Sequence, residues 1–255
     1  MTPAARQIEI ANLIRQHDHL TVNELAEILN ISRETIRRDL SELAQTGKIQ
    51  KFHGGASLPT IPGEGPFRDR MSKNAVAKNQ IAAAAVELIA PGETILIDTG
   101  STTFYFAEKL SELSDLTVVT NSTKIARVMS TPPATARTFL LGGEFHADNR
   151  QTIGSMVISQ LKSFRAHHAV LTIGALDART GVMDYSIEEA QLARGMIEQA
   201  ETLTLLVDSS KFEKIASFEV CGLKRVTNLV CDKQPTGKLR EALIDAGINI
   251  VCAET

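Results

Sequence analysis

The chain has 255 residues, of which 43% are hydrophobic, and this size allows one small and one larger domain with separate cores. The net charge of −3 does not by itself indicate nucleic-acid binding, so any binding of DNA has to rest on a local arrangement of charges. No apolar stretch is long enough to cross a membrane, and the first residues lack the apolar run of an export signal, so we expect a cytoplasmic protein without membrane contact.

Helical patterns fill most of the first 45 residues. Apolar residues recur at helical spacing over 5–16, and a second helix begins at Thr21, which forms a capping box with Glu24. Ser32 is the expected N-cap of a third helix, which buries Ile36 and carries arginines on its other side. Two helices joined by a short turn, the second basic near its N-terminus, are typical of a helix-turn-helix that reads the major groove.

A strand and a glycine turn follow, as in a winged helix-turn-helix. Residues 48–52 alternate in polarity, and the turn at 53–55 has a bare backbone that can approach phosphates. Residues 31–53 carry five basic and three acidic side chains, which concentrates positive charge here. A docking or dimerisation module with solvated arginines is the alternative. The DNA-binding residues expected are Ser32, Arg33, Glu34, Thr35, Arg37, Arg38, Lys51, His53 and Gly54.

A stretch rich in proline and glycine separates this module from the rest of the chain. Residues 57–66 contain three prolines and two glycines and have no apolar period, which is typical of a linker. We therefore expect a DNA-binding domain over residues 1–57, a linker over 58–73 and an effector-binding domain over 74–255.

Helical and strand patterns alternate in the second domain. Expected helices cover 75–90, 104–110, 123–130, 155–164, 188–200 and 237–246. Expected strands cover 94–97, 116–119, 138–141, 169–173, 202–207, 226–230 and 248–251. Repeated strand–helix units predict an α/β domain with a mostly parallel sheet, covered by helices and binding ligands at the carboxyl ends of its strands.

Polar residues follow several of these strands. The segment 98–103 lies between a strand and a helix, so its amides and hydroxyls can donate to a phosphate, and Lys211 adds positive charge. Asp98 or Asp177 can accept hydrogen bonds from sugar hydroxyls. Each motif alone is more often an ordinary turn or cap than a binding site, but their convergence on one end of the sheet favours a site. The effector-binding residues expected are Asp98, Gly100, Ser101, Thr102, Thr103, Asn121, Ser122, Gly142, Gly143, Gly174, Asp184, Tyr185 and Lys211.

The cysteine and histidine residues of the sequence do not indicate a metal or cofactor site. The three cysteines are an odd number without metal-type spacing, and the adjacent His167 and His168 have no second ligand pair nearby. His146 and Asp148 share a loop but lack further ligands. We expect no metal and no cofactor.

Both halves of the chain resemble one family of bacterial regulators. The runs 32–40 (SRETIRRDL) and 52–56 (FHGGA) are similar to the DNA-binding signature of the DeoR family, and 97–103 (IDTGSTT) and 206–212 (LVDSSKF) resemble its sensor domain. The resemblance implies a winged helix-turn-helix followed by a domain related in fold to ribose-5-phosphate isomerase and CoA transferases. It also implies a transcriptional repressor of a carbohydrate or polyol catabolic operon, released from operator DNA by a phosphorylated sugar or polyol.

The pair Asp184-Tyr185 resembles the glycerol-3-phosphate repressor branch of that family, which makes glycerol 3-phosphate the first candidate effector. Glu144-Phe145 does not follow that branch closely. The alternative function is a sugar-phosphate isomerase or a CoA-transferase-like enzyme using Glu188, Asp177 or Lys211, against which the DNA-reading module argues. Because helix-turn-helix proteins usually bind symmetric half-sites, we expect a homo-oligomer, either a dimer or a tetramer.

Overall fold

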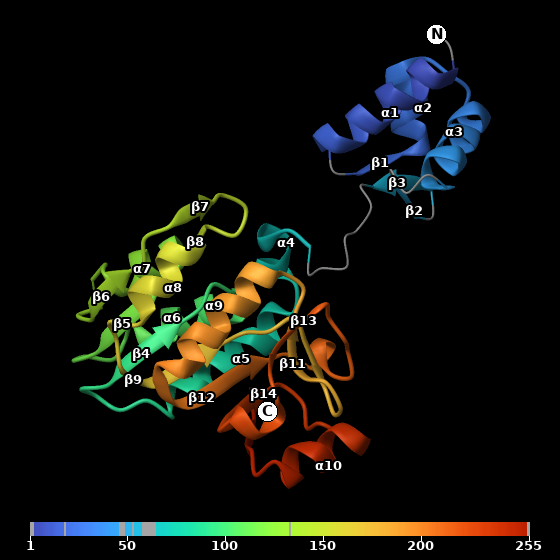
Figure 1. Ribbon diagram of the computed structural model, residues 1–255. Helices are drawn as coiled ribbons and strands as arrows, with labels where there is room; N and C mark the ends of the chain where they lie inside the picture. Colours follow the sequence, from blue (N-terminus) through green and yellow to red (C-terminus); the bar gives the residue numbers. More distant parts are fainter. Residues whose placement is uncertain are drawn as a thin grey trace. The chain divides into compact units, whose positions relative to one another are not determined.

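The computed structural model describes residues 3–17, 19–45, 49–52, 54–57, 65–132 and 134–253. The chain divides into one unit over residues 1–62 and another over 63–255 (Figure 1). Each unit has its own buried core. Within the described ranges, no helix is long and apolar enough to span a membrane.

The first unit packs helices against a small antiparallel sheet with strand order β1-β3-β2. Its elements are α1 (Pro3–His17), β1 (His19–Thr21), α2 (Val22–Leu29), α3 (Arg33–Gln45), β2 (Gln50–Phe52) and β3 (Gly55–Ser57). The expected capping box begins α2, since the Thr21 hydroxyl accepts from the Glu24 amide and the Glu24 carboxylate accepts from the Thr21 amide. The core is made by Ile10, Ile14, Leu20, Val22, Leu25, Ile36, Leu40, Leu43, Ile49 and Ala56. These elements confirm the winged helix-turn-helix.

The second unit is built around a seven-stranded sheet. Its α-helices are α4 (Phe67–Ser72), α5 (Ala75–Val86), α6 (Ser101–Leu110), α7 (Thr123–Met129), α8 (Ser155–Leu161), α9 (Ile187–Glu198) and α10 (Gly237–Asp245). The sheet strands are β4 (Thr94–Ile97), β5 (Thr117–Thr120), β6 (Arg137–Leu140), β9 (Ala166–Leu171), β12 (Ala200–Val207), β14 (Asn228–Cys231) and β15 (Asn249–Cys252). The remaining elements are β7 (Glu144–His146), β8 (Gln151–Ile153), β10 (Ala175–Asp177), β11 (Gly181–Asp184), β13 (Phe218–Cys221) and the 3-10 turns η1 (Ser209–Lys211) and η2 (Leu223–Arg225).

All neighbouring strands of the large sheet run parallel, in the order β15-β14-β12-β9-β4-β5-β6. Helices α5, α6 and α7 pack on one face, and α8, α9 and α10 pack on the other. Successive side chains of β4 point to opposite faces of the sheet. Ile95 and Ile97 pack on the face covered by α5, α6 and α7, and Leu96 packs on the face covered by α8, α9 and α10. The predicted α/β class with a mostly parallel sheet is confirmed.

The strand order reverses between β4 and β9. The chain proceeds from β4 through β5 to β6 in one direction, whereas β9, β12, β14 and β15 extend in the other. In open parallel sheets, ligands bind in the crevice at the carboxyl ends of the strands where this reversal occurs. The loops that follow β4 and β9 are therefore the first place to look for a site.

Two features differ from the sequence-based expectation. A linker was expected over 58–73, but residues 67–72 form α4, whose Phe67 is only 3% exposed. A helix of six residues is too short to show an amphipathic period, which explains the error. The short antiparallel strands β7, β8, β10, β11 and β13 were also not predicted, because pieces of three or four residues alternate too briefly to be recognised.

The loops that follow β4 and β9 approach each other so closely that no space remains for a side chain at Gly100. The φ of Gly100 is extended at −157°, so any residue could adopt its backbone conformation. A Cβ atom there would nevertheless overlap the side-chain methyl of Thr172, which follows β9. Glycine is required here for space rather than for backbone freedom.

We predict that Gly100→Ala lowers the free energy of unfolding by about 1–3 kcal/mol, as overpacking of a dense interior does. Adding Thr172→Ser removes the overlapping methyl and keeps the hydroxyl, so it should recover part of that loss. Urea unfolding of both single variants and the double variant measures this coupling. Equal losses with and without Thr172→Ser would contradict the steric explanation.

Candidate effector pocket and DNA-reading helix

Helix α3 presents a polar face to solvent. The Ser32 hydroxyl accepts a hydrogen bond from the Thr35 amide at 3.2 Å, as expected of an N-cap. The predicted DNA-contacting residues Ser32, Arg33, Glu34, Arg37 and Arg38 are exposed, and Thr35 is half-buried.

The buried side of α3 is attached to α1 by an ion pair. The Arg6 guanidinium donates to both oxygens of the Asp39 carboxylate, at 2.5 and 3.0 Å, and Asp39 is 1% exposed. A two-point contact of this kind restricts rotation of the helix. The polar face of α3 therefore has a defined orientation within the first unit.

The wing extends the exposed polar surface of the first unit. Lys51 on β2 donates to the Ser41 hydroxyl of α3 at 2.9 Å, which places its ammonium beside that helix. Gly54 has a φ of +93°, a left-handed conformation that favours glycine, and its carbonyl accepts from the Val22 amide. The predicted contact residue His53 lies outside the described residues.

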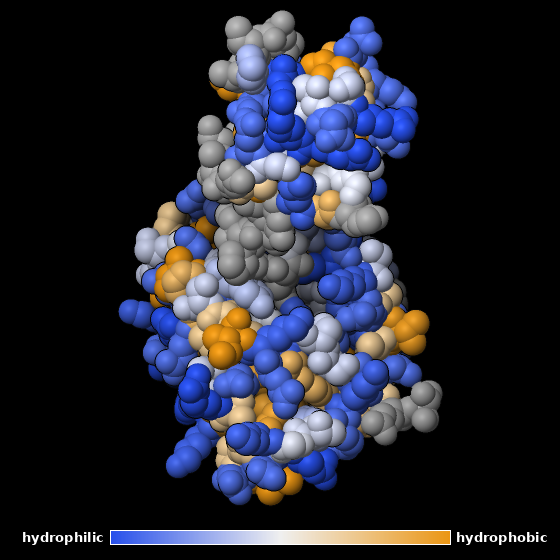
Figure 2. Space-filling view, turned by 90° about the vertical axis from the view of Figure 1, so that its right-hand side faces the viewer, coloured by the Kyte–Doolittle hydropathy of each residue, from blue (hydrophilic) through white to orange (hydrophobic). Residues whose placement is uncertain are grey.

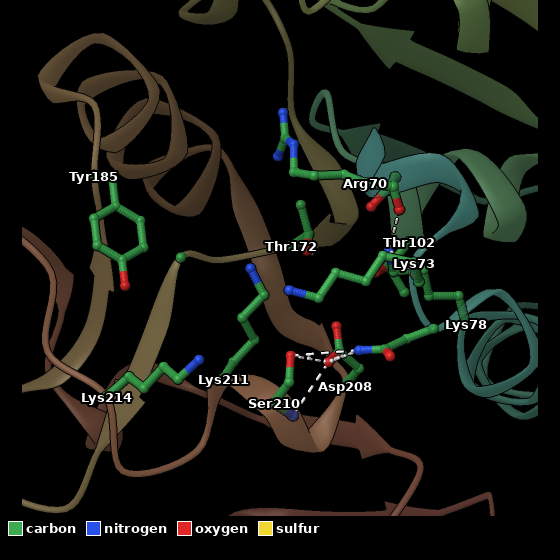
Figure 3. A pocket seen from close by; sticks show the side chains of 13 residues that line it. Arg70, Lys73, Lys78, Thr102, Thr172, Tyr185, Asp208, Ser210, Lys211 and Lys214 are labelled. Atoms are coloured by element: carbon green, nitrogen blue, oxygen red, sulfur yellow. Dashed lines mark hydrogen bonds between the residues drawn. The ribbon is translucent and has the colours of Figure 1, made fainter. Parts of the chain in front are cut away.

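In the second unit, a pocket of about 110 Å³ opens at the reversal of strand order (Figure 3). It collects residues from α4, from α5 and from the loops that follow β4, β9, β11 and β12. Its lining residues are Arg70, Lys73, Asn74, Lys78, Ser101, Thr102, Thr172, Gly174, Tyr185, Asp208, Ser210, Lys211 and Lys214. Five of these side chains are cationic and one is acidic, so the pocket suits an anion.

Two ammonium groups face each other across the pocket. The side chains of Lys73 and Lys211 point toward one another in Figure 3, although they come from opposite walls. Burial, together with the nearby charge of Lys214, lowers the pKa of Lys211 to about 8. An anion placed between these two side chains would attract both and favour the charged form of Lys211.

The acidic residue of the pocket is bound by its neighbours. The Asp208 carboxylate accepts hydrogen bonds from the Asn74 amide group at 3.0 Å and from the Ser210 backbone amide at 3.1 Å, and it also accepts from the Ser210 hydroxyl. These hydrogen bonds compensate the negative charge of the Asp208 carboxylate. An entering anion therefore meets mainly the lysines.

The start of α6 adds backbone donors to the lysines. The Phe104 amide donates to the Gly100 carbonyl, so the amides of residues 101–103 belong to the first turn, where the helix dipole favours an anion. Ser101 and Thr102 line the pocket directly. This end of the pocket resembles the phosphate-binding helix N-terminus that strand–turn–helix units commonly provide.

Carboxylates gather behind the cationic pocket, around a cavity of about 10 Å³. Asp98, Asp184 and Glu189 line this cavity together with Arg70, which also lines the pocket. Burial and the neighbouring Glu189 raise the pKa of Asp184 to about 7, and burial raises the pKa of Asp98 well above its ordinary value. The site thus has a cationic chamber and a buried acidic chamber that share one arginine.

The structure brings five of the predicted effector residues to the pocket, namely Ser101, Thr102, Gly174, Tyr185 and Lys211. Asp98 and Asp184 line the acidic cavity instead. Gly100 packs against Thr172, and the Thr103 hydroxyl donates to carbonyls of its own turn.

Four other predicted residues make contacts within the fold. The Asn121 side chain binds Thr99, Gln151 and the Thr152 carbonyl, and the Ser122 hydroxyl caps α7. Gly142 is bound through its backbone by the Gln160 side chain. Gly143 lies against α8 and β8, where a Cβ would meet Val157 and the Ile153 carbonyl.

Several pocket residues were not predicted. They are Arg70, Lys73, Asn74, Lys78, Thr172, Asp208, Ser210 and Lys214. Asp208 and Ser210 belong to the motif that drew attention to Lys211, so position after a strand could have identified them. The cations at 70, 73 and 78 carry no such signal, because they stand where a linker and an ordinary helix were expected. Asp177, considered for sugar hydroxyls, instead binds the Arg179 and Thr180 amides of its own turn.

We predict that Asp184 makes stability depend on pH in a defined direction. Since its folded pKa is about 7 and its ordinary value is 3.8, its contribution is full below about pH 4 and is lost as the pH rises through 7. Asp184→Asn keeps an oxygen for the Tyr185 and Ser186 amides, and it should reduce the fall in unfolding free energy between about pH 5 and pH 8. Urea unfolding across this range measures the fall, with Asp148→Asn as an exposed control. An unchanged pH profile in Asp184→Asn would refute the raised pKa.

Comparisons with known proteins agree with both units. A family described as the DeoR-like helix-turn-helix domain matches residues 6–61, and the DeoR C terminal sensor domain matches residues 73–233. The HTH-type transcriptional repressor CsqR of Escherichia coli is 29% identical over 251 residues, which cover 98% of this chain and 96% of the relative. The glycerol-3-phosphate regulon repressor of Escherichia coli is 30% identical over 250 residues, covering 98% and 99%.

A solved structure, ribose 5-phosphate isomerase A from Methanocaldococcus jannaschii, aligns with 56% of this chain and 57% of its own, at 18% identity and a TM-score of 0.42. The two family matches coincide with the two units of the structure, and the relatives align with nearly the whole chain. The chain belongs to the DeoR family and is a DNA-binding transcriptional repressor rather than an enzyme.

Proposed function

We propose that the second unit senses a phosphorylated sugar or polyol, whose binding releases the repressor from operator DNA of a carbohydrate or polyol catabolic operon. The observation that carries the proposal is the meeting of five cationic side chains and a helix N-terminus in one pocket at the reversal of strand order. A phosphate dianion gains charge-assisted hydrogen bonds from these groups, whereas a neutral sugar gains far less.

Glycerol 3-phosphate is the first candidate effector. Support comes from Asp184-Tyr185 and from the relative that is named a glycerol-3-phosphate regulon repressor. The phosphate would bind at Ser101, Thr102 and Lys211, and the hydroxyl groups would face Tyr185 and the acidic chamber. A small polar molecule with one anionic end matches this separation of charge.

DNA recognition is assigned to the exposed face of α3 and to the wing. Arg37 and Arg38 lie on that face, and Arg37 pairs with Glu34 at 3.3 Å in an exposed contact that DNA can replace at little cost. We also infer that the protein acts in the cytoplasm as a homo-oligomer, a dimer or a tetramer, because helix-turn-helix proteins usually bind paired half-sites.

We predict that Arg37→Ala and Arg38→Ala each weaken binding to an operator fragment selected from random-sequence DNA. A lost base contact should cost about 1–3 kcal/mol and relax specificity, while a lost phosphate contact should lower the salt slope by about one. The matched control is Arg127→Ala with Arg240→Ala, two exposed arginines of the second unit. Unchanged operator affinity in the Arg37→Ala, Arg38→Ala double variant would rule out α3 as the reading helix.

We predict that glycerol 3-phosphate, or another phosphorylated sugar or polyol in the same screen, raises the melting temperature and lowers operator affinity. A ligand at a hundred times its dissociation constant adds about 2.7 kcal/mol to stability. Ser101→Ala and Lys211→Ala should weaken both effects, whereas Lys238→Ala, an exposed lysine outside the pocket, should not. The proposal is wrong if no phosphorylated compound changes operator affinity, or if the pocket variants respond as the unaltered chain does.

A further inference from the structure

The helix that follows the linker forms one wall of the pocket. Arg70 on α4 and Lys73, which directly follows α4, both line the pocket. Lys73 points toward Lys211, whereas the Arg70 guanidinium donates to the Asn149 side chain at 3.0 Å. The anion site is therefore assembled from two parts of the second unit: the loops at the carboxyl ends of the strands, and the segment that joins this unit to the DNA-binding unit.

Helix α4 is too short to be stable alone, since isolated helices need roughly 12–15 residues in water and α4 has six. Contacts with α6 and α7 hold its first turn. Phe67 is buried, and the Lys124 ammonium of α7 lies 4.9 Å from its ring centre. The same ammonium lies 5.4 Å from the ring of Phe104 on α6. The position of α4 thus depends on a small number of side chains.

The other end of α4 is held through its carbonyl groups. The Lys78 ammonium donates to the Arg70 carbonyl at 2.5 Å and to the Lys73 carbonyl at 2.8 Å, and the Tyr105 hydroxyl donates to the Met71 carbonyl at 2.9 Å. A cation at the C-terminus of a helix also compensates its dipole. These contacts place Lys73 in the pocket, but they bring its charge toward Lys211.

Electrostatics then links the pocket to the position of α4. The side chains of Lys73 and Lys211 point toward one another across the pocket, and burial lowers the pKa of both Lys78 and Lys211. A dianion bound between Lys73 and Lys211 attracts both ammonium groups. Its binding free energy therefore includes the gain from holding α4 against the strand ends.

We propose that α4 couples the two functions of the protein: the effector's phosphate bridges Lys73, at the end of α4, to Lys211 and holds α4 in place, and operator binding favours α4 released from the pocket. This inference rests on the function proposed above. Effector and operator must weaken each other's binding by the same factor. Among the described residues that line the pocket, those of α4 lie nearest in sequence to the linker. Displacement of α4 can therefore couple effector binding in the second unit to operator binding by the first.

Hydrogen–deuterium exchange of the full-length protein tests the first part. With saturating glycerol 3-phosphate, and separately with inorganic phosphate, amides of residues 67–73 should gain protection together with those of residues 100–104. Operator DNA alone should reduce protection of residues 67–73. Protection of 100–104 without any change at 67–73 would overturn the role of α4 and leave the sensor function intact, whereas no protection at either segment would refute both.

Variants that loosen α4 without removing a pocket side chain test the coupling. Phe67→Ala and the milder Tyr105→Phe should retain operator binding, while the ratio of operator dissociation constants with and without glycerol 3-phosphate falls toward one. For the unaltered chain we expect a ratio of about 5–150. Arg68→Ala, an exposed arginine on the same helix, is the matched control and should keep the full ratio. If Tyr105→Phe and Phe67→Ala both keep that ratio while binding glycerol 3-phosphate, the proposal is wrong.

Discussion

The Thr172 backbone amide donates to both oxygens of the Asp98 carboxylate, at 3.2 and 3.0 Å, and the organisation of the sensor unit depends on this contact. It joins the loops that follow β4 and β9, the two strands between which the strand order reverses. Gly100 allows these loops to approach, and Ser101, Thr102 and Thr172 then lie on the same pocket. A carboxylate held in this way serves the fold, which explains why Asp98 lies behind the pocket rather than in it.

Separation of charge gives the site its chemical character. The pocket is cationic, the chamber behind it is acidic, and Arg70 contributes to the lining of both. Burial raises the pKa of Asp98 and of Asp184, and Arg70 lies near both groups. The carboxyl groups and the lysines thus lie in separate cavities that have Arg70 and Thr172 in common.

The sequence predicted the architecture better than the site. Long periodic segments and residues after strands, such as Ser101 and Lys211, were identified because the carboxyl ends of parallel strands meet at one edge. Lys73 was missed because a short helix after a proline-rich stretch has no recognisable period. Asn121 shows the opposite error, since its sequence position cannot reveal that its amide is already bound to the Thr152 carbonyl and the Thr99 hydroxyl.

The pairing of β4 with β9 also has a consequence for biosynthesis. Ile95 lies opposite His168, so the central strand pair cannot form until the chain has been synthesised well beyond residue 168, whereas the first unit pairs strands that all lie within residues 19–57. Local contacts form faster than distant ones, and N-terminal domains fold first during translation. On the ribosome, we expect the DNA-reading helix to be folded while the sensor still lacks its central strand pair. A chain released early by interrupted translation would therefore contain a folded first unit without the completed central sheet of the second unit.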